Sequence, residues 1–148
     1  SHFIFCIMDI QFQILDKEAI PSIIPLIQEF TNDKFSNEVL RSRFEAMFTQ
    51  HYECLGVLSG EKLIGVCGLW FQTRHYAGMS CEPDHVFIQP QYQGQGLGDK
   101  MFEYIASYCK AKGCESLELN TYVQNTASHK FYYNQGFKIL GYHFFKDL

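Results

Sequence analysis

Residues 86 to 98 read Val-Phe-Ile-Gln-Pro-Gln-Tyr-Gln-Gly-Gln-Gly-Leu-Gly, and this stretch decides the fold. The stretch predicts a strand that stops at Pro90, followed by three glycines at alternate positions. Directly after it, apolar residues spaced i, i+3, i+4 over residues 101 to 109 predict a helix. A glycine turn that opens a helix exposes several backbone N–H groups together, without Cβ atoms in the way. The stretch therefore predicts an anion-binding junction between a strand and a helix.

Spacing excludes two common nucleotide-binding motifs. A dinucleotide-binding turn needs G-x-G-x-x-G, and a phosphate-binding loop of the Walker type needs G-x-x-x-x-G-K-[ST]. Neither pattern occurs in residues 93 to 98, Gln-Gly-Gln-Gly-Leu-Gly. A glycine-rich connection without a ligand stays open as the alternative at this point.

Upstream, the sequence predicts a strand, two helices and a hairpin. Residues 10 to 15 alternate apolar and polar side chains, as a half-buried strand does, and Asp16 can cap the helix that follows. Ser36 can cap a second helix. The apolar runs at 52–58 and 62–72 flank a short polar connection, which is typical of a β-hairpin.

The second half of the chain is predicted to alternate strands and helices. Residues 84 to 89 form a strand, and residues 73 to 83 before it, which contain a glycine and a proline, are predicted as a loop. Beyond the helix that follows the glycines, we expect a strand at 117–123, a helix at 126–135 and a final strand at 137–145.

Composition favours one domain that spans residues 1–148 and is stabilised by packing alone. The chain has 148 residues, of which 47% are hydrophobic, and no linker-like segment. Its six cysteines form no C-x-x-C pair, so we expect them to be reduced and mostly buried, with no metal site. The net charge of -4 disfavours binding to nucleic acid.

No apolar run approaches the ~18 residues of a membrane span, so we expect no membrane contact and a cytoplasmic location. The apolar opening at residues 3 to 8 lacks the basic leader and cleavage site of a signal peptide. Ser1 and His2 are interpreted as a tag remnant, with a native start near Met8.

Two linked blocks resemble the GNAT N-acetyltransferase superfamily. The opening stretch matches its acyl-CoA signature, V-x-P-x-x-[RQ]-G-x-G-x-[GA], with Ile88 at the Val position, Pro90 at the Pro and Gln93 at the Arg or Gln. Residues 125 to 137 match N-x-x-A-x-x-[LF]-Y-x-x-x-G-F, with Ser128 in place of Ala.

The resemblance implies an α+β fold with a mixed, mostly antiparallel twisted sheet of six to seven strands and about four helices. Acyl-CoA would lie in the cleft between the two central strands. The C-terminus is short for this fold, so the last hairpin strand is either missing or borrowed from a partner, in a monomer or a homodimer.

The resemblance also implies acetyl-CoA as co-substrate. The backbone of residues 86 to 88 would lie beside the pantetheine arm, and the turn and helix start would hold the pyrophosphate. The implied cofactor-binding residues are Val86, Phe87, Ile88, Gln93, Gly94, Gln95, Gly96, Leu97, Gly98, Asp99, Asn125 and Ser128.

Acetyl transfer to an amine needs a base for the amine and an acid for the departing thiolate. Helix geometry places Asn125, Ser128 and Tyr132 on one face, with Tyr133 turned about 100° away, so Tyr132 is the predicted acid. Asn125 is equally well explained as a helix N-cap.

Asp84 is the first candidate for the base, two residues before Val86, with Glu82, His85 or a relaying water as alternatives. Acceptor contacts are expected from Asn32 and Asp33 and from residues 73 to 81, which include Arg74, His75 and Tyr76.

The leading hypothesis is an acetyl-CoA-dependent N-acetyltransferase in which a primary amine, slightly favoured as a small amine or polyamine, attacks the thioester directly. A protein or peptide amine acetyltransferase and a non-catalytic acyl-CoA-binding module are the alternatives.

Overall fold

A single five-stranded sheet forms the centre of the computed structural model, which describes residues 9 to 148. The strand order follows the chain, β1-β2-β3-β4-β5; the first four strands are antiparallel, and β5 runs parallel to β4. The strands are β1 (Ile10–Leu15), β2 (Tyr52–Ser59), β3 (Lys62–Arg74), β4 (Gly78–Ile88) and β5 (Ser116–Leu117).

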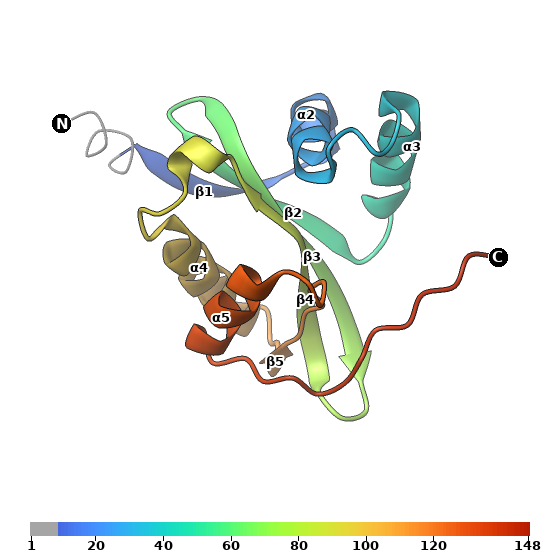
Figure 1. Cartoon of the computed structure of the whole chain (residues 1–148), viewed down its shortest axis with the longest axis vertical. Coiled ribbons are helices and arrows are strands. Elements are labelled where there is room, and N and C mark those ends of the chain that lie inside the picture. The colour runs from blue at the N-terminus through green and yellow to red at the C-terminus, as the bar shows by residue number, and fades with distance from the viewer. Residues whose placement is uncertain (1–8) are drawn as a thin grey trace.

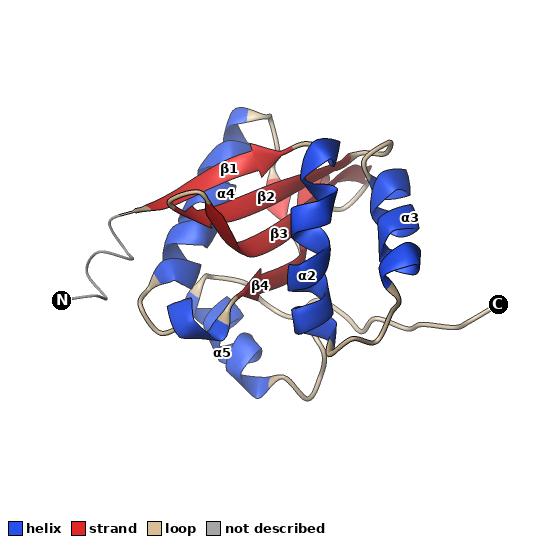
Figure 2. Cartoon of the chain, turned by 90° about the horizontal axis from the view of Figure 1, so that it is seen from above, coloured by secondary structure: helices blue, strands red, loops and turns tan. Residues whose placement is uncertain are grey.

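Within residues 9 to 148, four α-helices cover the two faces of the sheet, two on each (Figures 1 and 2). On one face lie α2 (Ile20–Thr31) and α3 (Asn37–Met47). On the other lie α4 (Leu97–Ala111) and α5 (Thr126–Asn134). Short 3-10 turns at Lys17–Ala19 (η1) and Pro90–Tyr92 (η2) precede α2 and α4. Both the α+β class and the number of helices are therefore confirmed.

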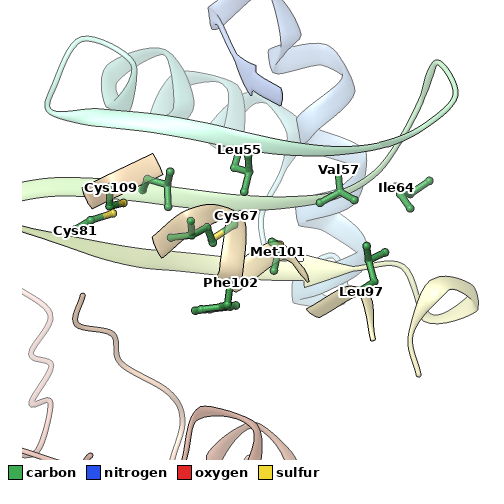
Figure 3. Close-up of a cluster of buried hydrophobic side chains, with 11 residues drawn as sticks. Leu55, Val57, Ile64, Cys67, Cys81, Leu97, Met101, Phe102 and Cys109 are labelled. Carbon is green, nitrogen blue, oxygen red and sulfur yellow. The ribbon is translucent and has the colours of Figure 1, made fainter. Parts of the chain in front are cut away.

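The hydrophobic core is divided by the sheet into two clusters, because successive side chains of a strand point to opposite faces. Cys54 of β2 packs with α2 and α3, whereas its neighbour Leu55 packs with α4. Figure 3 shows the α4 cluster, where Met101 and Phe102 lie against the sheet and the side chains of Cys81 and Cys109 lie together.

Local signals for helix ends are confirmed, with one shift. Ser36 accepts a hydrogen bond from the Val39 N–H (3.2 Å), as a cap of α3 should. Asp16 accepts from the Glu18 N–H (3.1 Å), so it caps η1, and α2 begins directly after that turn. Gly113, with φ of 96°, follows the end of α4.

The prediction of a loop at residues 73 to 83 is wrong. Strand β3 continues to Arg74, and β4 begins at Gly78, so only three residues connect them. Pro83 lies inside β4. Pro83 lies two positions after Cys81, so the backbone groups of both residues face the same neighbouring strand. The Cys81 carbonyl accepts the Glu118 N–H (3.0 Å), so the N–H that proline lacks would have faced β5 rather than β3.

The predicted strand count is also wrong, with five strands in place of six to seven. Only Ser116–Leu117 of the predicted strand 117–123 is a strand, because β5 and β4 pair over two residues and then separate. The predicted final strand 137–145 is an unpaired segment, whose residues beyond Phe137 are exposed. Alternating apolar residues made both segments look like strands, but residues 119 to 123 and 138 to 145 pair with no strand of the described chain.

Among the described cysteines, Cys54, Cys67, Cys81 and Cys109 are buried and Cys114 is partly exposed, which confirms the prediction of mostly buried thiols. Cys6 and the suggested start at Met8 lie outside the described residues. Across residues 9 to 148, no helix has the length and apolar character that a membrane span requires.

Candidate active site

The glycine turn is shaped to leave space above its backbone. Gly94 and Gly96 have φ of 77° and 75°, a region that other residues rarely adopt, and a Cβ added at either position would meet no atom within 4 Å. Gly96 is the N-cap of α4 and supplies no side-chain hydrogen bond to the first turn. The first N–H groups of α4 are thus available to an anion, which the helix dipole favours.

Helix α5 packs directly against the start of α4. A Cβ at Gly98 would come within 3.2 Å of the Phe131 ring, so glycine permits the close approach. The Gln135 side-chain amide donates to an Asp99 carboxylate oxygen, which ties the other end of α5 to the first turn of α4. Asn125 Oδ1 accepts the Ser128 N–H (3.3 Å), so Asn125 does cap α5.

Strands β4 and β5 separate immediately after they pair. Ser80 and Cys81 pair with Ser116 and Leu117, and the bond from the Glu118 N–H to the Cys81 carbonyl is the last one between them. Pro83 cannot donate to the next position. Backbone groups of β4 beyond residue 83 therefore face a gap, and Val86, Phe87 and Ile88 lie along it.

Tyr132 lies on the α4 and α5 face of the sheet, packed against the α4 cluster. Its ring packs against Phe102 (centroids 5.7 Å apart) and Phe137 (5.8 Å). Burial raises the pKa of Tyr132 to about 12, with a smaller contribution from Cys67. Its phenol consequently holds its proton at neutral pH. Tyr133 is 55% exposed, which confirms that it is turned away.

Three carboxylates gather on the opposite face, beside the same gap. Glu118 accepts hydrogen bonds from buried Ser80 (2.7 Å) and from Tyr76 (3.1 Å). Arg74 lies 3.1 Å from Glu118 and 4.0 Å from Glu82, measured between nitrogen and oxygen. Asp84 accepts from the Trp70 indole (3.3 Å). We call Glu82, Asp84 and Glu118 the carboxylate cluster.

The carboxylate cluster has three acidic side chains and one basic neighbour, Arg74, so a net negative charge remains. Burial, and then the charges of Asp84 and Glu118, raise the pKa of Glu82 above its ordinary value, while Arg74 lowers it by less. A further positive charge close to Glu82 would relieve this repulsion.

A β-bulge in β4 places His85 beneath the carboxylate cluster. The register between β3 and β4 shifts between Val66 and Gly68, and His85 adopts a φ of 37°. The ring reaches Tyr52, whose hydroxyl lies 2.7 Å from His85 Nε2. A Cβ on Gly68 would lie 2.2 Å from that same nitrogen, so the ring occupies the space a side chain would need.

Burial lowers the pKa of His85, which keeps the imidazole neutral at pH 7. Its Nδ1 is buried and has no hydrogen-bond partner among the described residues. The Asp84 carboxylate accepts the His85 backbone N–H (2.9 Å), so the bulge also fixes Asp84. His85 is thus part of the framework that positions the carboxylate cluster.

The remaining predicted residues divide between the two faces. Val86 and Ile88 pack toward α4, whereas Phe87 packs toward α2, with its ring 5.6 Å from Phe30. Asn32 and Asp33 follow α2 in the left-handed region, with φ of 53° and 58°. Of the predicted acceptor residues, Arg74 and Tyr76 join the carboxylate cluster, and His75 stacks edge-on against Tyr76.

Sequence reasoning missed Glu118, Trp70 and Tyr52. Glu118 lies 36 positions from Glu82 in the sequence. Trp70 and Tyr52 lie 14 and 32 positions from Asp84, and only strand pairing brings these residues together. No local signal marked Glu118, because it occupies an ordinary polar position between Leu117 and Leu119 in the apolar–polar alternation.

A splayed β4 and β5, an open glycine turn on α4 and a tyrosine on α5 define the fold of an acyl-CoA-dependent transferase. Residues 20–137 match the acetyltransferase (GNAT) family, and the chain belongs to that family. Members of this family use acetyl-CoA, and the chain is an N-acetyltransferase that acts on amines.

Two curated relatives and one solved structure show the range of similarity. An aminoalkylphosphonate N-acetyltransferase from Salmonella typhimurium is 27% identical over 135 residues, 88% of this chain and 86% of the relative. A spermidine N(1)-acetyltransferase from Thermoplasma acidophilum is 25% identical, over 76% of this chain and 64% of the relative.

The solved structure is the aminoglycoside acetyltransferase AAC(6')-Iy in complex with a bisubstrate analogue of CoA. It matches with a TM-score of 0.80 at 14% identity, and the match covers 94% of this chain and 97% of that one. This likeness confirms the fold.

Proposed function

We propose that this protein transfers the acetyl group of acetyl-CoA to a primary amine of a small, polycationic molecule. The observation that carries the proposal is the carboxylate cluster beside the gap between β4 and β5. Glu82 and Glu118 share Arg74 there, and Asp84 adds a third acidic side chain. An amine that carries further positive charges would be attracted to the cluster, and it would lessen the repulsion that, after burial, raises the pKa of Glu82.

Residues of the opening stretch are proposed to hold acetyl-CoA, which supplies the acetyl group as a thioester. The N–H groups from Gly94 to Asp99 would bind the pyrophosphate, in agreement with the uncapped start of α4 and the empty space above Gly94 and Gly96. Phe87 and Ile88 pair with β3, but residues 86 to 88 have no strand partner on the side of β5. Backbone groups on that side would contact the pantetheine arm and polarise the carbonyl oxygen.

Asp84 is the proposed base and Tyr132 the proposed acid, on opposite faces of the gap. Asp84 would take the proton that the amine loses, on a carboxylate already fixed by the His85 N–H. Tyr132 would give its phenolic proton to the departing thiolate, and its raised pKa keeps that proton available. Direct attack of the amine then needs no covalent enzyme intermediate.

Charge separates the candidate substrates that the relatives suggest. An aminoalkylphosphonate carries an anion, which the carboxylate cluster would repel, whereas spermidine carries extra cations. The acidic surroundings of Glu82 therefore favour the polyamine class.

Steady-state release of CoA thiol tests the proposal on substrates of different charge: an aminoglycoside, spermidine, a monoamine with no second charge, an aminoalkylphosphonate and a peptide with a free N-terminus. We expect kcat/KM to fall in the order in which positive charge falls. The Asp84→Asn variant should lose turnover on spermidine, and Glu45→Gln, a change at an exposed carboxylate on α3, should not.

Fastest turnover of the peptide or the phosphonate would refute the polycation assignment. CoA binding without turnover of any amine would refute the enzymatic proposal and favour an acyl-CoA-binding module. Full activity of Asp84→Asn would transfer the role of base to Glu82, His85 or a water.

A further inference from the structure

Helix α4 ends in a tight turn that brings two cysteines together. The Cys114 N–H donates to the Cys109 carbonyl (3.0 Å), and the Gly113 N–H donates to the Lys110 carbonyl (3.0 Å). Gly113 has a φ of 96°. These two bonds around a left-handed glycine define a Schellman motif, in which the side chains at the positions of Cys109 and Cys114 frequently contact each other. Where other motifs of this kind place two apolar side chains, this one places two thiols.

A third thiol lies beside the pair. Cys81 of β4 and Cys109 are both buried in the α4 cluster, and Figure 3 shows their side chains together. Cys114 packs against the same cluster and is partly exposed. Hydrogen bonds between side chains link the three thiols in the order Cys81, Cys109, Cys114. A reagent that arrives from solvent therefore meets Cys114 first.

These hydrogen bonds make Cys109 the most acidic of the three thiols. The hydrogen bond from Cys81 lowers the pKa of Cys109, and the one from Cys114 lowers it further, whereas burial raises it. The same hydrogen bond, and then burial, raise the pKa of Cys81. Burial, and then the neighbouring Cys109, raise the pKa of Cys114. A thiolate in this group accordingly resides on Cys109, and the thiolate is the form that attacks sulfur.

We propose that Cys109 and Cys114 are a reversible dithiol–disulfide site which, when oxidised by a small-molecule disulfide, ties the start of β5 to the end of α4. The proposed acetyl transfer uses neither thiol. Directly after Cys114, the Glu115 N–H donates to the Met79 carbonyl (2.7 Å), and β5 then pairs with β4 over two residues. So short a strand is weakly held, and a covalent link one residue before it would restrain it.

Two successive displacements at sulfur form the disulfide. Cys114 gives up its proton, and its sulfur attacks one sulfur of the small disulfide, whose other half leaves as a thiolate and takes up a proton. The Cys109 thiolate then attacks Cys114 Sγ in the mixed disulfide and releases the second half in the same way. Cys109 and Cys114 together lose two electrons and two protons, and the small disulfide gains them and becomes two thiols.

The link would act on one wall of the gap between β4 and β5. The Glu118 N–H, one residue beyond β5, donates to the Cys81 carbonyl (3.0 Å), and the Glu118 carboxylate belongs to the carboxylate cluster. Oxidation would keep this bond and the one from the Glu115 N–H closed for a larger fraction of the time. The site thus controls how often the edge of the sheet opens.

Equilibration of the unmodified chain with mixtures of reduced and oxidised glutathione tests the site. After acid quenching and alkylation of the free thiols, the oxidised protein should carry two alkyl groups fewer than the reduced protein. Trypsin then identifies the pair, because cleavage after lysine and arginine places all six cysteines in separate peptides. Peptides 101–110 and 113–130 should be joined.

Three results of this mapping would overturn the proposal. They are the absence of a protein disulfide at every glutathione ratio, a bond between peptides 75–100 and 101–110, which contain Cys81 and Cys109, and a glutathione adduct on Cys114 that Cys109 never displaces.

Cys114→Ser and Cys54→Ala form a matched pair of variants. Cys54 packs on the other face of the sheet, so its loss leaves the dithiol intact. Each variant is melted in reduced and in oxidised glutathione and so serves as its own reference. Oxidation should raise the melting temperature of the unmodified protein and of Cys54→Ala by about 5 °C, because a disulfide restricts the unfolded chain. An equal rise in Cys114→Ser would contradict the assignment.

Hydrogen exchange measures the effect on β5 directly. The amides of Glu115 and Glu118 should exchange roughly tenfold more slowly in the oxidised protein, whereas the amides of α3, on the other face of the sheet, should be unchanged. If Glu115 and Glu118 exchange at the same rate in both forms, the disulfide does not restrain β5 and the proposal fails.

Discussion

The cofactor side and the acceptor side of the candidate active site are made of different chemical groups. The proposed cofactor side consists of backbone N–H groups, glycines and apolar packing, and it comes from two short segments: the turn at residues 93 to 99 and the helix α5. The proposed acceptor side consists of charged and polar side chains from β2, β3, β4 and the residue after β5. Residues that act together within one short segment leave a motif in the sequence, whereas a cluster assembled across strands leaves none.

The largest effect is expected at Tyr132, the proposed acid. Replacing Tyr132 with Phe should lower kcat by roughly 100-fold or more, the usual contribution of a general acid, with little change in CoA affinity. Tyr133→Phe, one residue away and exposed, is the matched control. Rates are measured by thiol release. Equal rates for the two variants would remove Tyr132 from the chemistry.

Gly96→Val tests whether the cofactor side depends on open backbone. The substitution puts a β-branched side chain at a φ of 75° and into the space above the turn, so CoA affinity should fall by roughly 100-fold. Gly60→Val introduces comparable strain at a φ of 61° in the β2–β3 hairpin, also with no atom within 4 Å. Calorimetry should show normal CoA binding to the control; equal losses would point to backbone strain alone.

Gly68→Ala tests whether the acceptor side depends on the bulge. The new Cβ would displace the His85 ring and break its contact with Tyr52, which we expect to destabilise the fold by ~1–3 kcal/mol and to raise KM for the amine. At Gly56 a Cβ would meet only the end of the Leu15 side chain, which can move, so Gly56→Ala should cost less. Thermal unfolding and amine kinetics check both, and an unchanged KM in Gly68→Ala would separate His85 from the acceptor site.

Glu82→Gln tests the charge of the acceptor side and has the smallest expected effect. The pKa of Glu82 is raised, so the side chain becomes neutral as the pH falls through that value, and KM for a polycationic amine should rise there. The Gln variant should have a KM roughly tenfold higher above that pH and lack the acidic limb.

The stability of the fold should depend on pH in the opposite direction to amine binding. Because the folded state favours the neutral form of Glu82, the unmodified protein loses stability as the pH rises through the raised pKa. Glu82→Gln removes this loss, so its melting temperature should exceed that of the unmodified protein only at the higher pH. A pH-independent difference would contradict the role given to the charge.

Sequence patterns predicted the glycine turn and most of the fold because both depend on local rules. Glycines at positive φ, the cap at Ser36 and the spacing of α4 are visible within a few residues. The start of β4 was not predicted because a proline usually interrupts a strand. Pro83 is tolerated because β5 no longer pairs with β4 at this position. Glu118 and Tyr52 were missed because strand pairing, a long-range property, brings them to the site.

Pro83 has a consequence for affinity as well as for architecture. Since it offers no donor toward β5, the ligand-free protein has no hydrogen bond at that point for an incoming molecule to break. The separation of the two strands is already present before binding, and the interaction energy of a ligand in the gap is not spent on prising them apart. For a ligand that binds between β4 and β5, Pro83 would therefore make the site preorganised.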